Sequence, residues 1–176
     1  MKHNLFSTPV WHIKGTSQEL IDELYEAAYK VKEVYKDTPK RSNEGGYQTP
    51  VIEWESFHPE GKDLVEKAIR ECDKSIFPNF KIQGWWYNIN GKGHWNHPHT
   101  HPNCDIAAVL YLTDSDGLLH LLSPFPQRRV DRNGDHVSVA AQKGDIILFP
   151  SDIVHYVLPN ERDSDRISIT MNLQLC

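Results

Sequence analysis

The sequence has few cysteines, no long apolar run and no excess of positive charge, and each of these absences excludes a class of protein. Only three of the 176 residues are cysteines, and none stands in a Cys-x-x-Cys spacing. We therefore expect neither a disulfide framework nor a structural zinc site. No stretch of about 18 consecutive apolar residues exists, so a membrane-spanning helix is excluded. The N-terminal residues lack the apolar segment of a secretory signal, and we expect a cytoplasmic protein.

The charge balance excludes a nucleic-acid partner. The formal net charge is −5, with 19 Lys and Arg against 24 Asp and Glu, whereas non-specific nucleic-acid binding needs a basic surface that displaces counterions from phosphates. Hydrophobic residues make up 39% of the chain, which is enough for a packed core. We expect a single domain over residues 1–176, with a helical support region at 1–80 and a β-rich core at 81–176.

The first part of the sequence predicts two amphipathic helices. Thr16 and Glu19 have the spacing of a capping box, and apolar residues follow at intervals of three and four until Asp37–Pro39 ends the helix. A second helix is expected from Glu60 to Ile76. Its buried side would consist of Leu64, Val65, Ala68, Ile69 and Cys72. We expect both helices to cover one face of a sheet.

From residue 81 onward, short β-branched and aromatic runs alternate with turn residues such as Asn90-Gly91 and Lys143-Gly144. The eight predicted strands are Ile82–Ile89, His94–His101, Ile106–Leu112, Leu118–Leu122, Val137–Ala141, Ile146–Phe149, His155–Val157 and Arg166–Leu173. So many short strands favour a closed or double-sheet antiparallel architecture, a jelly roll, over a parallel sheet.

Histidine is over-represented, with ten residues in the chain. Four of them lie close together, at His94, His97, His99 and His101. Because side chains alternate along a strand, the last three would point to one side if the segment is extended. Imidazoles two residues apart can share a metal, and His155, in a later apolar stretch, is a candidate third ligand. A solvated histidine-rich turn and a satisfied core histidine are the alternative interpretations.

The last predicted strand carries a polar face opposite an apolar one. The polar face consists of Arg166, Ser168, Thr170 and Asn172. If the apolar face packs on the protein, these side chains line an interior cavity. An arginine there needs an anion, and its planar guanidinium suits a carboxylate bound through two hydrogen bonds. The Ser168 hydroxyl would join the same anion, whereas a surface salt bridge of Arg166 is the alternative.

Several stretches of the sequence together carry a family resemblance. They are Leu5–Trp11, Trp86–Asn88, Gly91 or Gly93, Pro98–Pro102, Val109–Leu112, Gly144–Ser151, His155, Pro159–Asn160 and Arg166–Asn172. With these residues the chain resembles the 2-oxoglutarate- and Fe(II)-dependent oxygenases, and more closely their short members from bacteria and bacterial viruses. The family pattern is His-x-(Asp or His), a distant His and Arg-x-Ser. The segment from Gly144 to Ser168 is its most specific part.

The resemblance implies a fold, cofactors and site residues. The fold would be a mainly β, cupin-like double-stranded β-helix (jelly roll) with two or more N-terminal helices packed on one sheet. The implied ligands of Fe(II) are His99, His101 and His155. Arg166 with Ser168 would hold the distal carboxylate of 2-oxoglutarate, and Tyr111 would donate a further hydrogen bond to this co-substrate. His101 departs from the family, in which most members have a carboxylate at that position.

The implied activity is hydroxylation of a small-molecule or peptide substrate by molecular oxygen, with release of succinate and carbon dioxide. The loop Ser123–Arg132 carries three arginines; it either covers the site and contacts an acidic substrate or is an ordinary solvated loop. Trp85, Trp86 and Trp95 either pack in the core and rim or form a stacking surface for the substrate.

A second pattern competes for the same histidines. The spacing of Gly91 and Gly144 to the residues that follow them matches much of the two cupin motifs. This pattern would assign the metal to His97, His99 and His155. However, the glutamate that cupins have shortly after His99 is missing, and the pattern gives Arg166 no role. A cupin-like metalloprotein without 2-oxoglutarate and a non-catalytic jelly-roll binding module are therefore the alternative functions.

Overall fold

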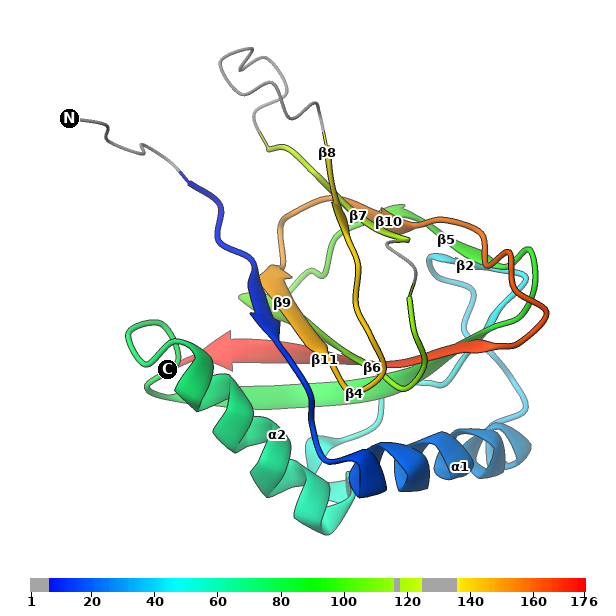
Figure 1. Ribbon diagram of the computed structural model, residues 1–176, viewed down its shortest axis with the longest axis horizontal. Coiled ribbons are helices and arrows are strands. Elements are labelled where there is room, and N and C mark those ends of the chain that lie inside the picture. Colours follow the sequence, from blue (N-terminus) through cyan, green and yellow to red (C-terminus); the bar gives the residue numbers. More distant parts are fainter. Residues whose placement is uncertain (1–6, 116–117, 125–135) are drawn as a thin grey trace.

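Two antiparallel sheets face each other, and two helices cover the outer side of one of them (Figure 1). The computed structural model describes residues 7–115, 118–124 and 136–176. In chain order the elements are β1 (Trp11–Ile13), α1 (Gln18–Val34), β2 (Asn43–Glu44), β3 (Tyr47–Gln48), η1 (Trp54–Ser56), α2 (Pro59–Cys72), β4 (Phe80–Asn90), β5 (Trp95–His99), β6 (Ile106–Tyr111), β7 (Leu119–Leu122), β8 (His136–Val139), β9 (Ile146–Pro150), β10 (His155–Val157) and β11 (Arg166–Leu175). Within these described ranges, no helix is long and apolar enough to cross a membrane.

The strand order confirms the predicted fold class, a mainly β jelly roll with N-terminal helices on one sheet. The larger sheet has the order β1-β9-β6-β11-β4-β3, and the smaller sheet has the order β2-β5-β10-β7-β8. Every strand pair is antiparallel. Consecutive strands such as β4 and β5, or β10 and β11, belong to different sheets, so the chain crosses between the layers as in a jelly roll.

All eight strands expected after residue 81 are present, and the structure adds three short strands before it. β1 extends the larger sheet, whereas β2 pairs with β5 and β3 pairs with β4, so the β2–β3 segment joins the two sheets at one side. Strands of two or three residues are too short to show a period. Residues 125–132 of the expected arginine-rich loop lie outside the described residues.

The start of α1 differs from the predicted capping box by one residue. Ser17 is the N-cap, and its side chain accepts a hydrogen bond from the Leu20 backbone N–H. Thr16 instead holds the helix start against the larger sheet, because its backbone N–H and its hydroxyl both donate to the Gly144 carbonyl, at 2.9 and 3.0 Å. Thr16 is thereby held at the turn before β9, and the helix is capped one residue later.

The predicted buried face of α2 was wrong at two of its positions. Leu64 is 44% exposed and Cys72 is exposed, whereas Gly61, Val65 and Ile69 are buried. The helix begins at Pro59, and residues four apart form its buried stripe. Leu64 lies about 100° away from Val65 around the axis and faces solvent. The helix also ends at Cys72, four residues before the predicted Ile76.

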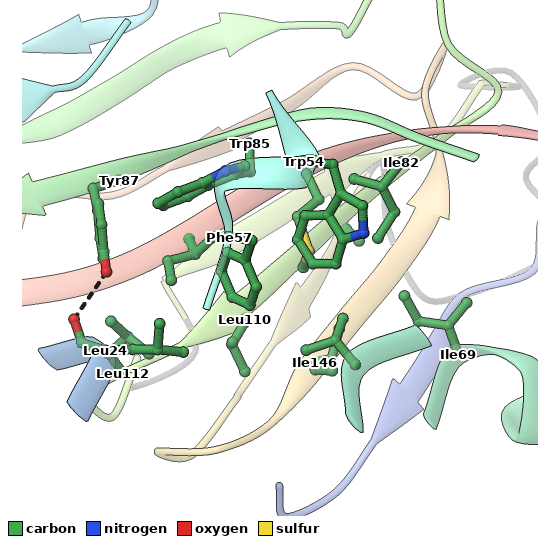
Figure 2. Packing of buried hydrophobic residues seen from close by; sticks show 14 of the residues in the cluster. Leu24, Trp54, Phe57, Ile69, Ile82, Trp85, Tyr87, Leu110, Leu112 and Ile146 are labelled. Carbon is green, nitrogen blue, oxygen red and sulfur yellow. Dashed lines mark hydrogen bonds between the residues drawn. The ribbon is translucent and has the colours of Figure 1, made fainter. Parts of the chain in front are cut away.

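The main hydrophobic core lies between the two helices and the larger sheet (Figure 2). Trp54 stacks on Phe57 with ring centroids 4.4 Å apart, and Phe57 meets Trp85 edge to face at 5.0 Å. The Tyr87 hydroxyl donates to the Leu24 carbonyl of α1 at 3.0 Å. Trp85 is thus a core residue and no part of a substrate surface. With one face of the larger sheet committed to this core, its other face is left to line the space between the sheets.

Candidate active site

The two sheets enclose a cavity of about 460 Å³. The larger sheet contributes alternate side chains of β11 to its wall, and these are Arg166, Ser168, Thr170 and Asn172. This is the polar face that the sequence predicts. Cross-strand pairing places β4 and β6 on either side of β11. Asn88 of β4 and Tyr111 of β6 therefore flank Ser168, and both line the cavity.

Three histidines meet in the cavity. Two of them lie on strands of the smaller sheet, and the third lies in the loop after one of these strands. His99 ends β5, His155 begins β10, and these two residues pair directly across the strands. His101 follows in the loop after β5, where its backbone N–H donates to the Ser151 carbonyl at 2.9 Å. The potential ligand atoms of the three side chains all lie within 4.8 Å of one another.

Each of the three imidazoles uses its Nδ1 atom for a hydrogen bond to an oxygen acceptor. His99 bonds to the His97 carbonyl at 2.7 Å, and His155 bonds to the Ile153 carbonyl at 3.0 Å. His101 bonds to the Asn172 side-chain oxygen at 2.8 Å. Because these oxygens can only accept, each Nδ1 carries the proton and each Nε2 keeps a free lone pair. This is the arrangement in which imidazole binds a metal.

Burial keeps the three histidines neutral at physiological pH. It lowers the pKa of His101 to about 4 and that of His155 to about 3, and it also lowers the pKa of His99. Aromatic rings contribute to this burial. Trp86 stacks on His101 with centroids 5.6 Å apart, and Phe149 meets His155 edge to face at 4.7 Å. Only neutral imidazole can coordinate, so the cluster is ready for a metal without losing protons first.

Arg166 offers a buried cation on the opposite wall. Its side chain is almost inaccessible, with the residue 5% exposed, and one guanidinium nitrogen, Nη1, donates to the Leu158 carbonyl at 3.0 Å. The other, Nη2, has no hydrogen-bond partner among the described residues. Burial lowers the pKa of Arg166 to about 10, which leaves it charged, and raises the pKa of buried Tyr111 to about 12. An unpaired buried guanidinium nitrogen calls for an anionic ligand.

His97 lies apart from the three-histidine cluster. Its side chain is 46% exposed, and its Nε2 atom lies 3.2 Å from the Glu44 carboxylate of β2. The cupin-type assignment with His97 is therefore not supported. The expectation that His101 lies on the same strand as His97 was also wrong, because β5 ends at His99. His101 reaches the cluster from a loop that contains Asn103 at a positive φ of 67°.

Sequence analysis gave no site role to several other cavity residues, among them Arg41, Ser42 and Gln48. Trp86 and Asn88 also line the cavity; they were noted only as part of the resemblance, and Trp86 also as packing or as a substrate surface. Asn88 donates to the Thr170 hydroxyl at 2.9 Å and so fixes the wall beside Ser168. Arg41, Ser42 and Gln48 belong to no stretch that carries the resemblance, and the pairing of β2 with β5 and of β3 with β4 brings their segment to the site.

Comparison with known protein families gives one match. The family described as "Putative 2OG-Fe(II) oxygenase" matches residues 84–172, a segment that begins in β4, ends in β11 and includes all three histidines and Arg166. The comparison with curated proteins gave no match.

Several solved structures are similar to the whole chain. HygX from Streptomyces hygroscopicus, with nickel and 2-oxoglutarate bound, has 11% identity and a TM-score of 0.69 over 95% of this chain and 82% of that one. A prolyl-4-hydroxylase from Pseudomonas putida has 15% identity and a TM-score of 0.66 over 97% and 94%. The viral collagen prolyl hydroxylase of Paramecium Bursaria Chlorella virus-1, in complex with 2-oxoglutarate, has 17% identity and a TM-score of 0.64 over 93% and 94%. At these identities the likeness shows a shared fold.

Proposed function

Because the chain belongs to the family of 2-oxoglutarate- and Fe(II)-dependent oxygenases, we propose that its iron is held by His99, His101 and His155. The observation that carries this assignment is that each of these histidines, of which His101 and His155 are buried, has its Nδ1 atom bonded to an oxygen and its Nε2 atom free. Imidazole nitrogens are good ligands for iron. All three ligands are neutral, whereas most of the superfamily supplies one carboxylate.

We also propose that Arg166, with the neighbouring Ser168 hydroxyl, binds the distal carboxylate of 2-oxoglutarate. The unpartnered Nη2 atom supports this role, because a carboxylate would satisfy it and balance its charge. Tyr111 pairs with Ser168 across β6 and β11, and we propose that its hydroxyl donates a further hydrogen bond to the co-substrate. Burial raises the pKa of Tyr111, so its hydroxyl keeps the proton that it must donate.

The activity of the family is hydroxylation, with molecular oxygen and 2-oxoglutarate as co-substrates. When bound, iron and 2-oxoglutarate together supply the oxidising chemistry, and the co-substrate leaves as succinate and carbon dioxide. The chain itself fixes the ligands and excludes water. The two carbonyls and Asn172 hold the imidazole planes, while Trp86 and Phe149 cover two of the rings.

The remaining parts of the proposal concern the size of the substrate, the number of domains and the cellular compartment. The cavity volume of about 460 Å³ lies in the lower part of the range of small-molecule sites, roughly 300–1,000 Å³, and supports a small-molecule substrate. Strands from before and after residue 80 share both sheets, which supports one domain over residues 1–176. All three cysteines are free, as in a reducing cytoplasm, and we include that compartment in the proposal.

Anaerobic titration tests the proposed site. Fe(II) should bind at about one ion per chain, and addition of 2-oxoglutarate should then produce the visible charge-transfer band of an iron-bound 2-oxo acid. His155→Ala should remove both signals, whereas His97→Ala should keep them. Metal binding without the band in the wild type, or loss of iron in His97→Ala with retention in His101→Ala, would contradict the assignment.

A further inference from the structure

We propose that the prime substrate carries an anionic group, a carboxylate or a phosphate, bound at the side of the cavity by Arg41, Ser42 and Gln48. The inference rests on the proposed function, because it takes Arg166 as the partner of 2-oxoglutarate and asks what the remaining polar groups bind. It names the chemical class of the second substrate.

The charge of the cavity wall is the first observation. The chain has 24 acidic residues and a net charge of −5. Among the described residues that line the cavity there is no aspartate and no glutamate, but there are two arginines, Arg41 and Arg166. A wall that is positive in an acidic protein attracts anions and repels cations.

The two arginines belong to different walls. Arg166 opens β11, which lies between β4 and β6 in the larger sheet. Arg41 precedes β2, the edge strand of the smaller sheet. One carboxylate of 2-oxoglutarate would pair with Arg166 and the other would bind at the metal, so both charges of the co-substrate would be matched without Arg41. The second cavity arginine is left for another anion.

Arg41 has no counter-charge within the described part of the chain. Its backbone N–H donates to the Asn43 side chain at 3.4 Å, but no described residue forms a hydrogen bond or an ion pair with its guanidinium. The nearby acid on β2, Glu44, lies against His97 at 3.2 Å instead. The guanidinium is therefore available for a ligand.

Gln48 is the second group that lacks a partner. It is 3% exposed and lines the cavity, yet its side-chain amide makes no hydrogen bond to any described residue. Its main chain is fully engaged, since Thr38 Oγ1 donates to its carbonyl at 2.9 Å and accepts from its N–H at 3.0 Å. The amide atoms are not among the fully enclosed side-chain atoms that lack a partner, so they are accessible from the cavity and can bond to a ligand there.

Ser42 completes the set of donors. Its carbonyl accepts from the His97 N–H at 2.8 Å, and its hydroxyl oxygen accepts from Asn96 at 3.3 Å. The hydroxyl hydrogen is thus free to donate into the cavity that Ser42 lines. A guanidinium, a hydroxyl and an amide N–H₂ on one short segment are a suitable donor set for a carboxylate or phosphate. Because β2–β3 joins both sheets, all three donors are held at one side of the cavity.

The test uses the iron-loaded enzyme and a fractionated metabolite pool. A small-molecule extract of bacterial cells is separated on an anion-exchange column into a retained, anionic fraction and an unretained fraction. Each fraction is incubated with enzyme, oxygen and isotope-labelled 2-oxoglutarate. Mass spectrometry then measures labelled succinate and any compound that gains one oxygen atom. We expect only the retained fraction to raise succinate formation above the uncoupled rate.

Two variants that each remove one positive charge test whether Arg41 binds the anionic compound. Arg41→Gln should raise the half-saturating concentration of the compound found in the retained fraction by about tenfold or more. Lys40→Gln removes the same charge from the adjacent residue, which is exposed and does not line the cavity, and should stay within about twofold. Anaerobic equilibrium dialysis of the compound, which requires no turnover, should give the same ranking.

Four results would overturn the inference. The first three are stimulation by the unretained fraction, stimulation by neither fraction, and unchanged affinity for the compound in Arg41→Gln. A rise in the half-saturating 2-oxoglutarate concentration in Arg41→Gln as large as in Arg166→Ala would also overturn it, because Arg41 would then bind the co-substrate. Failure of the proposed function is detected separately. In that case the wild type, given Fe(II) and 2-oxoglutarate before any extract is added, would lack the charge-transfer band.

Discussion

At the scale of single residues, the candidate metal site depends on the orientation of three imidazole rings. Two of the three Nδ1 atoms bond to backbone carbonyls, of His97 and Ile153, which no substitution can remove. The third bonds to the side chain of Asn172 on the opposite sheet. Asn172 therefore connects the two walls of the cavity, and it is the one acceptor of the three that mutation can test.

Asn172→Leu should weaken iron binding. The substitution keeps a similar size but removes the acceptor, so His101 loses the bond that fixes its ring and its tautomer. Loss of such an outer partner typically lowers metal affinity by about 10- to 100-fold, which competition with a coloured Fe(II) chelator under anaerobic conditions can measure. Gln174→Leu, on the same strand but exposed and outside the cavity, is the matched control and should leave the affinity unchanged. Equal losses in the two variants would argue against this role for Asn172.

At the scale of elements, the pairing of strands explains what sequence could and could not predict. Both helices and the longer strands after residue 80 follow from hydrophobic periodicity, which reports on each segment by itself, while the three-residue β10 was predicted from its apolar surroundings. His155 was predicted because it is a polar residue in an apolar stretch, and Arg166 because it begins a strand whose polar and apolar residues alternate. The face of α2, the strands β1–β3 and the cavity residues Arg41 and Gln48 depend on which segments pack together. That information is absent from any local window.

The corrected face of α2 predicts different costs for two alanine substitutions. Ile69 is fully buried, and Ile69→Ala should lower the free energy of unfolding by about 2–5 kcal/mol because it leaves a cavity in the core. Leu64 is 44% exposed, and Leu64→Ala should cost less than about 1 kcal/mol. Urea denaturation followed by circular dichroism measures both. Similar costs at the two positions would restore the face that the sequence predicted.

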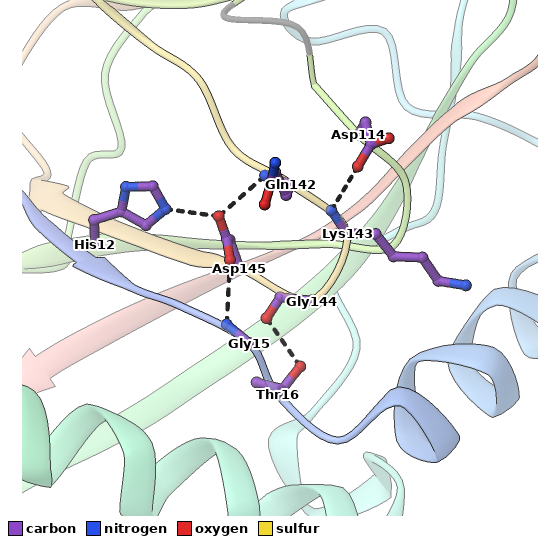
Figure 3. Close-up of polar contacts among 8 residues, drawn as sticks. All are labelled: His12, Gly15, Thr16, Asp114, Gln142, Lys143, Gly144 and Asp145. Carbon is purple, nitrogen blue, oxygen red and sulfur yellow. Dashed lines mark hydrogen bonds and ion pairs between the residues drawn. The ribbon is translucent and has the colours of Figure 1, made fainter.

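The junction of β1 with β9 depends on one carboxylate (Figure 3). Asp145 accepts hydrogen bonds from the Gln142 N–H at 3.0 Å and the Gly15 N–H at 3.2 Å, and lies 2.7 Å from His12 Nε2. Burial alone would raise the pKa of Asp145, but these bonds together lower it below its ordinary value of 3.8. A carboxyl whose pKa is lower in the folded state stabilises the fold above that value, and the contribution is lost as pH falls through the folded pKa.

Asp145→Asn should therefore destabilise the protein at pH 7 and flatten its stability at acidic pH. An amide oxygen accepts more weakly than a carboxylate and its NH₂ group would face the Gln142 or Gly15 N–H, so we expect a cost of about 1–3 kcal/mol. Below roughly pH 4 the wild type loses the same contribution, and the two proteins should converge. Urea denaturation at a series of pH values measures this. Asp152→Asn, at an exposed position, is the control. A difference that persists undiminished at pH 3 would show that the charge of Asp145 is not its cause.

At the scale of the whole molecule, both sheets contribute to the cavity. The interior of this 176-residue chain therefore has two parts, an apolar core beside the helices and a cavity between the sheets. The outer face of the larger sheet and the helices form the larger of the two apolar clusters, which lies outside the space between the sheets. Only a smaller apolar cluster, which includes Tyr111, Leu119 and Phe149, packs between the sheets. The polar, partly unsatisfied remainder of that space is then available for ligands. Iron and 2-oxoglutarate would connect the histidines on one side to Arg166 on the other.

Ligand binding should therefore stabilise the whole fold in two separable steps. A ligand that binds only the folded state at about 100 times its Kd adds about 2.7 kcal/mol, which for a protein of this size raises Tm by roughly 5–11 °C. We expect one such rise with Fe(II) and a further rise with 2-oxoglutarate, measured anaerobically by differential scanning calorimetry. Arg166→Ala should keep the first rise and lose most of the second, because its metal ligands are intact but the distal carboxylate has no partner. His155→Ala should lose both, because without the metal the co-substrate lacks its second attachment. A full 2-oxoglutarate step in Arg166→Ala would mean that the co-substrate lies elsewhere in the cavity, with its distal carboxylate on another group.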